Sequence, residues 1–304
     1  MKITITIETT EISPAFRREI AAEESNNETL LVLAEDLDCE VREAVAKNEN
    51  TSAEILSKLA EDLDCDVRRA VAKNPKTSAE ILSKLADDND WIVRGRVAEN
   101  SNTSEESLSK LKEDYDSDVR SAVAENPSTS AKILSELAED GSWSVREAVA
   151  KNPKTSAEIL SKLAEDEHED VSVRVIENPN ASTEILSKFV EADKNLNTLE
   201  EVLSELAKND EWKVRAAVTR NPKTSAEILS KLAEDEDSDV RAAIAENPNT
   251  SVEILSKLAR NSDWIIRELV AKNPNTSVEV LSKLAEDEDS DVSKAAKENP
   301  NFKK

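Results

Sequence analysis

The side chains with the clearest capacity for chemistry are carboxylates that alternate along short acidic segments. Four segments carry aspartate at every second position: Asp62, Asp64 and Asp66; Asp114, Asp116 and Asp118; Asp235, Asp237 and Asp239; Asp287, Asp289 and Asp291. This alternation is typical of the start of a calcium-binding loop, whose sixth position requires glycine. That position is valine here, as at Val67, and the valines belong to a predicted helix core. Capping of helix starts therefore explains the carboxylates better, and weak binding of divalent cations at the acidic turns stays an alternative.

An arginine recurs at equivalent places along most of the chain. The series is Arg42, Arg68, Arg94, Arg120, Arg146, Arg215, Arg241 and Arg267. A row of guanidinium groups suits an anionic ligand, but a guanidinium also forms bidentate hydrogen bonds with a carboxylate. Because the acidic segments recur with the same period, we expect a structural arginine ladder that pairs with the carboxylates of adjoining turns.

Large and small side chains alternate three residues before these arginines. Four of the large ones are tryptophans: Trp91, Trp143, Trp212 and Trp264. One interpretation is size complementarity, in which each indole lies over the small neighbour in the next repeat. The other is a row of aromatic anchors for a partner, since tryptophan is enriched at binding hot spots. These four residues are the predicted partner-binding residues.

The remaining reactive side chains do not combine into a catalytic or metal-binding group. Cys39 and Cys65 occupy equivalent places in adjacent repeats, where stacked helices lie about 9–10 Å apart. A disulfide needs Cα atoms closer than about 7 Å, so free thiols are expected. His168 is the single histidine, so it lacks a second ligand or base. The sequence predicts no catalytic residue, no metal site, no cofactor and no enzyme activity.

All of these positions recur with one period. A valine, or an isoleucine at Ile266, directly precedes each arginine of the series. The spacing is 26 residues from Val41 to Val145, and Val171 continues it. After a step of 43 residues the spacing resumes at Val214 and runs to Val292. A fixed period of this length indicates a stacked repeat architecture rather than separate globular domains.

The unit at residues 67–92, VRRAVAKNPKTSAEILSKLADDNDWI, predicts two short helices. The first is expected from about residue 66 to 73, and Asn74–Pro75 ends it, with Asn74 in the left-handed conformation of a helix stop. The second is expected to open with a capping box between Thr77 and Glu80. Neither helix exceeds about ten residues, which is too short for stability in isolation. Each repeat must therefore pack on its neighbours.

The recurring pattern VRxAVAxNPxTSxxxLxxLAxD resembles the leucine-rich repeat variant family, over roughly residues 30 to 300. The matching residues of the unit above are Val67, Arg68, Val71, Ala72, Asn74, Pro75, Thr77, Leu82, Leu85, Ala86 and Asp88. The resemblance implies an all-α fold, a right-handed α-solenoid (superhelix) of alternating α-helices and shorter helices. A founding member of the family holds an iron–sulfur cluster in a cysteine-rich segment that is not found here, so that function is not expected. HEAT-like arrays are the neighbouring alternative, with longer repeats.

The expected organisation is about ten 26-residue two-helix repeats with one inserted helix. Residues 1–29 form a strand-like segment (Met1 to Glu8), expected to pack on the cap, and a capping half-repeat. Residues 30–181 form a first sub-array, residues 182–213 a repeat with the inserted helix, and residues 214–304 a second sub-array with its cap. The inserted helix is expected to bend or offset the array and to mark the boundary between sub-arrays.

Composition limits the class of partner. The net charge of −25, from 65 acidic and 40 basic residues, argues against nucleic acid and membrane surfaces. We expect a cytoplasmic monomer that acts as a non-enzymatic repeat scaffold and presents an extended surface to a protein or peptide, in particular a basic one. A designed or purely structural array without a dedicated ligand is the alternative, because NPKTSAEILSKLAED occurs at both 152–166 and 221–235.

Overall fold

The computed structural model describes residues 13–190 and 196–302. Its chain divides into two compact units, with the boundary between Lys154 and Thr155. Every regular element in the described ranges is an α-helix, and none of these residues forms a strand. The strand predicted at Met1 to Glu8 lies outside the described residues. Among the helices of the described part, none has the length and apolar content needed to cross a bilayer.

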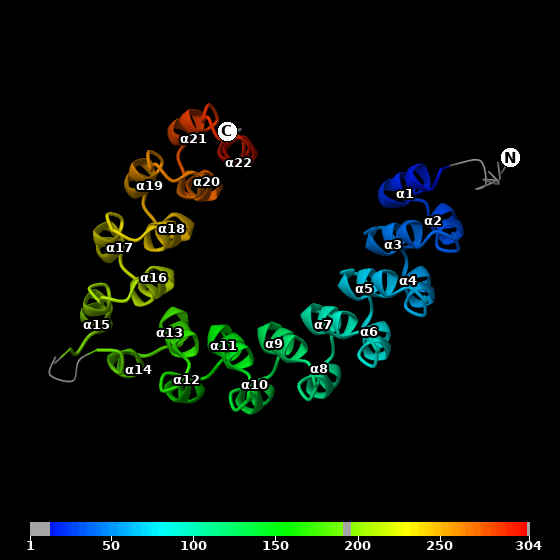
Figure 1. The fold of residues 1–304 in the computed structure, drawn as a ribbon, viewed down its shortest axis with the longest axis horizontal. Coiled ribbons are helices and arrows are strands. Elements are labelled where there is room, and N and C mark those ends of the chain that lie inside the picture. Colours follow the sequence, from blue (N-terminus) through cyan, green and yellow to red (C-terminus); the bar gives the residue numbers. More distant parts are fainter. Residues whose placement is uncertain (1–12, 191–195, 303–304) are drawn as a thin grey trace. The chain divides into compact units, whose positions relative to one another are not determined.

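Two kinds of helix alternate along the chain, as Figure 1 shows for each unit. The longer ones, called first helices, are α1 (Pro14–Glu23), α3 (Cys39–Lys47), α5 (Cys65–Lys73), α7 (Trp91–Glu99), α9 (Ser117–Glu125), α11 (Trp143–Lys151), α13 (Glu169–Glu177), α16 (Trp212–Arg220), α18 (Ser238–Glu246), α20 (Trp264–Lys272) and α22 (Ser290–Glu298). The shorter ones, called second helices, are α2 (Asn27–Leu33), α4 (Ala53–Leu59), α6 (Ala79–Leu85), α8 (Glu105–Leu111), α10 (Ala131–Leu137), α12 (Ala157–Leu163), α14 (Thr183–Ser187), α15 (Leu199–Leu206), α17 (Ala226–Leu232), α19 (Val252–Leu258) and α21 (Val278–Leu284).

The first helices stack on one another inside each unit. In the first unit α1 packs on α3, and the stack continues through α5, α7 and α9 to α11. In the second unit α13 packs on α16, and the stack continues through α18 and α20 to α22. Within each unit, each repeat contacts its sequence neighbours, so the described part of the chain is an all-α solenoid, as the sequence predicted.

The core consists of the apolar stripes of both kinds of helix. Val67 and Val71 of α5 and Leu82 of α6 have no solvent exposure, and the equivalent Leu160 and Leu229 are also fully buried. Burying one such side chain contributes about 1.5–3 kcal/mol relative to exposure. Helices of seven to nine residues are stable because they share this burial with adjacent repeats.

Side chains at both helix starts satisfy backbone N–H groups that have no partner within the helix. Asp64 caps α5, and its carboxylate accepts a hydrogen bond from the Asp66 N–H at 2.8 Å. Ser78 caps α6 and accepts from the Ile81 N–H at 3.4 Å. The predicted capping box of Thr77 was wrong: its hydroxyl is buried and donates to the Val71 carbonyl at 2.6 Å, so it links the two helices of one repeat.

The predicted conformation of the asparagine after each first helix was also wrong. Asn74 has φ −67° and ψ 128°, an extended conformation, and no non-glycine residue of the described ranges has a positive φ. Its side chain is buried because the amide donates to the Ala46 carbonyl of the preceding repeat at 2.7 Å. The amide oxygen accepts from the Lys76 N–H at 2.9 Å. Asn74 therefore joins repeats in addition to ending a helix.

The irregular step between Val171 and Val214 contains one extra second helix. Both α14 and α15 lie between α13 and α16 in the chain, and α14 contacts α15. The stack of first helices continues across the insertion, because α13 packs on α16 and the Asn221 amide donates to the Ile176 carbonyl at 2.5 Å. The insertion lies inside the second compact unit, and the four-part division with a bend at the insertion stays a prediction.

Candidate binding surface

The segment between a second helix and the next first helix, called the acidic turn, is held by an arginine. Arg68 donates from Nε to one carboxylate oxygen of Asp88 at 2.6 Å and from Nη2 to the other at 3.0 Å. Its Nη1 donates to the backbone carbonyls of Asp62 at 2.8 Å and Leu63 at 3.1 Å. One guanidinium therefore fastens its own acidic turn to the turn of the next repeat, an arrangement we call the Arg–Asp clamp.

The same bidentate geometry recurs in both units. The pairs are Arg17–Asp36, Arg42–Asp62, Arg68–Asp88, Arg94–Asp114, Arg120–Asp140, Arg215–Asp235 and Arg267–Asp287. Arg17 was absent from the predicted series because the N-terminal helix lacks the Val–Arg signature. In each pair the carboxylate lies 19 or 20 residues after the arginine, a spacing that could have identified Arg17.

Arg146 and Arg241 of the predicted series also donate to the backbone of their own acidic turns. Arg146 donates from Nη1 to the Asp140 carbonyl at 2.8 Å. Arg241 donates to the carbonyls of Asp235 at 2.6 Å and Glu236 at 2.9 Å. The residue 20 positions after Arg241 is Asn261, which carries no charge. Arg241 therefore holds its own acidic turn without a carboxylate in the place that aspartate takes in the clamps.

In each clamp, the arginine and the aspartate stabilise the charged form of each other. Burial alone would raise the pKa of the Asp62 carboxyl, but hydrogen bonds from Arg42 and the Asp64 N–H hold that pKa below its usual value. The Arg42 pKa is raised, mainly by its hydrogen bond with Asp62. Paired guanidinium groups likewise lower the pKa of Asp36, Asp140, Asp235 and Asp287. Both partners are therefore ionised at neutral pH, which gives charge-assisted hydrogen bonds.

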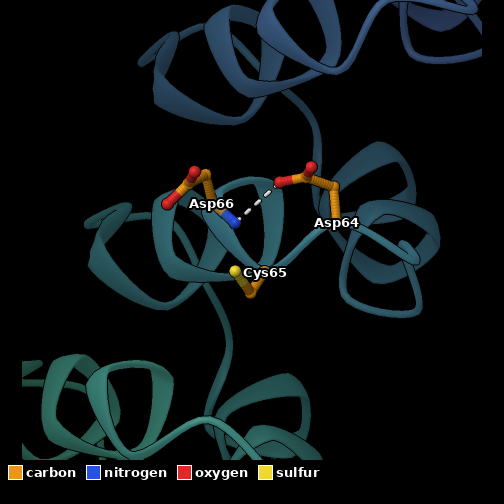
Figure 2. Close-up of side chains that lie close together, drawn as sticks. All are labelled: Asp64, Cys65 and Asp66. Carbon is orange, nitrogen blue, oxygen red and sulfur yellow. Dashed lines mark hydrogen bonds between the residues drawn. The ribbon is translucent and has the colours of Figure 1, made fainter.

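Two of each set of alternating aspartates accept hydrogen bonds from backbone N–H groups of the turn and the helix start. Asp62 accepts from the Asp64 N–H at 2.9 Å, and Figure 2 shows Asp64 accepting from the Asp66 N–H. Potential metal-binding atoms of Asp64, Cys65 and Asp66 lie within 4.8 Å of one another. With Asp62 counted as the first position, the sixth is the fully buried Val67, so the segment enters a helix where a calcium loop would turn. Helix capping accounts for this arrangement.

The four predicted tryptophans share one structural position and are partly exposed. Trp91, Trp143, Trp212 and Trp264 are the first residues of α7, α11, α16 and α20. Each lies directly after the turn between a second helix and a first helix, and between 37% and 43% of its surface is exposed. The turn before Trp264 carries Arg260 as well as Asp263, whereas the other three have an excess of acidic residues. The first unit carries two of them and the second unit two. Each unit therefore presents indole surface beside carboxylates.

The cysteines and the histidine lie on the same side of the repeats, at the starts of first helices. Cys39 and Cys65 are the first residues of α3 and α5, and both are free thiols, as predicted. Burial raises the pKa of the Cys39 thiol, and the adjacent Asp64 raises it further. A protonated thiol is a poor nucleophile. His168 takes the N-cap position of α13, where most other first helices have aspartate or serine.

Sequence reasoning missed a second set of connections between repeats, made by asparagine. The buried amides donate to a carbonyl at the end of the preceding first helix in Asn48, Asn74, Asn100, Asn126, Asn152, Asn221, Asn247, Asn273 and Asn299. We call this set the asparagine ladder. A signal was present in the sequence, because asparagine recurs at this one position. The chain has 2 glycines, and ending a helix does not by itself require asparagine each time.

No family profile matches the chain, and no curated protein matches it. Among solved structures, it is similar to a leucine-rich repeat variant with a novel repetitive structural motif (19% identity, 87% of this chain and 88% of that chain, TM-score 0.39). It is also similar to an engineered protein (20% identity, 93% and 92%, TM-score 0.31) and to importin beta (12% identity, 95% and 49%, TM-score 0.31). The chain is a helical repeat protein, similar to the family that its repeat pattern resembles.

Proposed function

We propose that the protein is a non-enzymatic scaffold that binds a basic protein or peptide along its acidic turns. The proposed contact residues are Trp91, Trp143, Trp212 and Trp264. The observation that carries the proposal is their shared place: each exposed indole lies directly after an acidic turn. Indoles supply large contact areas at binding hot spots, and the net charge of −25 attracts cationic partners. The partner would contact each unit separately through its own pair of tryptophans.

The chemistry of the surface grooves supports a role without catalysis. A groove of about 750 Å³ lies over α1 and α3, and one of about 540 Å³ lies over α3, α5 and α7. Their charged side chains pair with each other, as Arg18 does with Glu40 and Glu43 with Lys47. Neither lining contains a histidine or a cysteine. Histidine is the commonest acid–base group and cysteine a common nucleophile, so these linings of paired charges favour a surface without catalysis.

The role of the Arg–Asp clamps belongs to the same proposal. In the clamps from Arg42 onward, each guanidinium has a bidentate carboxylate partner and one or two carbonyl partners, which leaves little hydrogen-bonding capacity for a ligand. We therefore assign these arginines a structural role. The free thiols of Cys39 and Cys65 fit a reducing compartment such as the cytoplasm, and the proposed working state is a monomer.

The tryptophans allow a direct test. A variant with Trp91, Trp143 and Trp264 replaced by alanine would be compared with the original chain for binding of an oligolysine peptide and for proteins recovered by pull-down. The matched control replaces Val252 and Val278, which are also exposed but lie on second helices. The proposal expects weaker binding for the tryptophan variant alone. Equal binding by all three proteins would contradict it and would favour a purely structural array.

A further inference from the structure

Every acidic turn of the first unit presents one large apolar side chain to solvent. In three turns this is the residue two positions before the first helix, and in two turns it is the tryptophan that starts the helix. In chain order the five side chains are Leu37, Leu63, Trp91, Tyr115 and Trp143. We call this set the apolar row. Consecutive members belong to consecutive repeats, so the row follows one edge of the stack.

The leucines of the row contribute nothing to the core. Leu37 and Leu63 are each 99% exposed, and Tyr115 is 79% exposed. Apolar side chains stabilise a fold through the surface that they bury, and here that surface stays in water. Tyr115 has one structural contact, because the Arg94 guanidinium lies 4.7 Å from its ring centroid. Single exposed leucines are ordinary, but an apolar residue at each of five successive turns marks an interaction surface.

The two positions that supply the row complement each other. The residue two positions before a first helix is called the middle residue. Where the middle residue is Asn89 or Gly141, the first residue of the following helix is tryptophan. Where the middle residue is leucine or tyrosine, the helix begins with cysteine or serine, as at Cys39 and Ser117. Each turn therefore has one large apolar side chain, either two residues before the first helix or at its first residue. Packing between repeats does not explain this substitution pattern, because the leucines contact no core.

The second unit lacks this continuity. The middle residues of its acidic turns are exposed and polar or acidic: Glu167, Asp210, Glu236, Ser262 and Glu288. Trp212 and Trp264 are the large apolar side chains at the turns of this unit, so two of five turns carry one. The apolar row is thus a property of the first unit and does not follow from the repeat itself.

The surroundings of the row define the charge of its occupant. Exposed carboxylates border Leu63 on both sides, with Glu61 before it and Asp66 after it. A second copy of this chain would bring the same carboxylates to the interface, and like charges placed opposite each other oppose association. An occupant with cationic side chains around its apolar ones would instead match both features of the surface.

The repeat distance defines the spacing of the occupant's apolar residues. Packed helices lie about 8–10 Å apart, so equivalent positions of adjacent repeats, such as Leu37 and Leu63, recur at about that interval. A polyproline II helix rises about 3.1 Å per residue with three residues per turn, which places every third side chain on one face at about 9.3 Å. A β-strand repeats its faces at about 6.6 Å and does not match.

We propose that the apolar row binds an extended basic peptide segment, in the polyproline II conformation, whose apolar residues occupy every third position. This inference rests on the proposed function and adds to it the apolar anchors and the spacing of the partner. The five turns accommodate about five triplets. The leucines at the start of the row supply contacts that the tryptophan positions alone do not.

The test uses two synthetic peptides of fifteen residues, one with five Leu-Lys-Lys triplets and one with five Ser-Lys-Lys triplets. Titration at about 150 mM salt, where exposed charges are screened beyond about 8 Å, separates apolar from purely ionic binding. The full chain is expected to bind the leucine peptide at least tenfold more tightly than the serine peptide. The double variant Leu37→Ser/Leu63→Ser is expected to lose about tenfold in affinity for the leucine peptide, or ~1.4 kcal/mol. The control variant Val252→Ser/Val278→Ser is expected to bind as the original chain does.

Each outcome discriminates between the two proposals. Because both leucines are exposed, the double variant keeps its fold, which circular dichroism verifies. Equal binding of the leucine peptide by the double variant and the original chain would overturn the apolar row. If a variant with alanine at Trp212 and Trp264, which lie outside the row, then still lost binding, the scaffold function would stand without the row. Equal affinity for the leucine and serine peptides would show an ionic contact alone and also overturn it. Tighter binding of a peptide with one leucine per seven residues would replace the extended partner by a helical one.

Discussion

The asparagine ladder makes the substitution of Asn126 by alanine a sensitive test of how the repeats are joined. The Asn126 amide donates to the Ala98 carbonyl at 2.5 Å and the Asn100 carbonyl at 3.0 Å, and its oxygen accepts from the Ser128 N–H at 2.7 Å. Alanine removes all three hydrogen bonds. The Asn126 side chain is buried, so water does not readily replace them.

The expected loss of stability can be worked out from these contacts. A buried polar group left without a partner costs about 1–3 kcal/mol. Ala98 is fully buried, so its carbonyl carries most of this cost, and the Ser128 N–H lies next to solvent and loses less. We expect a decrease of about 2–3 kcal/mol in the free energy of unfolding. Asn102 is the matched control: its amide also donates to the preceding repeat, at the Pro75 carbonyl, but it is exposed.

Urea unfolding followed by circular dichroism would give the two differences in stability, and amide hydrogen exchange would locate them. Because each repeat contacts only its neighbours, Asn126→Ala should increase exchange in α7 and α9 more than in distant helices. Asn102→Ala should cost less than about 0.5 kcal/mol. If the two variants lost equal stability, buried amide bonds between repeats would not be what holds the stack, and the reasoning would fail.

Further predictions concern the acidic turns. Replacing Asn261 by Asp supplies the carboxylate that Arg241 lacks, so thermal unfolding should show a gain of about 0.5–1.5 kcal/mol. The pKa of Asp62 is lowered in the folded state by Arg42, so its contribution to stability is present above the unfolded pKa of about 3.9 and is lost as pH falls through the folded value. Acid titration should therefore show stability falling below about pH 4, and the substitution Asp62→Asn should reduce that acid-dependent loss. Calcium at millimolar concentration should leave the melting temperature unchanged, because the Asp64 carboxylate is engaged as a helix cap.

The repeat, the helices and the core could be predicted from the sequence because they depend on local periodicity. Apolar residues at helical spacing recur every 26 residues, and a stripe such as Val67, Val71, Leu82 and Leu85 can be buried only against adjacent copies. The inserted helix was also predicted within residues 182–213, and α15 begins there with a capping box between Thr198 and Glu201. Each of these features is encoded within one repeat.

Two side-chain roles were predicted wrongly because each side chain bonds to a different helix and not to the helix end beside it. Asn74 and Thr77 have side chains that suit a helix stop and a helix cap, and local reasoning assigned them those roles. Their actual partners are the carbonyls of Ala46, in the preceding repeat, and Val71, in the preceding helix. Deep burial decides the outcome, since a buried amide or hydroxyl must find a protein partner, and burial at these positions follows from stacking.

Stability and binding are assigned to different side chains of the same repeat. The Arg–Asp clamp of Arg68 and the asparagine ladder at Asn74 fasten each repeat to the next through buried or half-buried groups. The exposed side chains, such as Leu63 in the middle of the turn and Trp91 at the helix start, take no part in those connections. A substitution at Leu63 therefore changes the surface without removing a link of the stack. This separation is what allows the apolar row to differ between the two units while the clamps and the ladder recur in both.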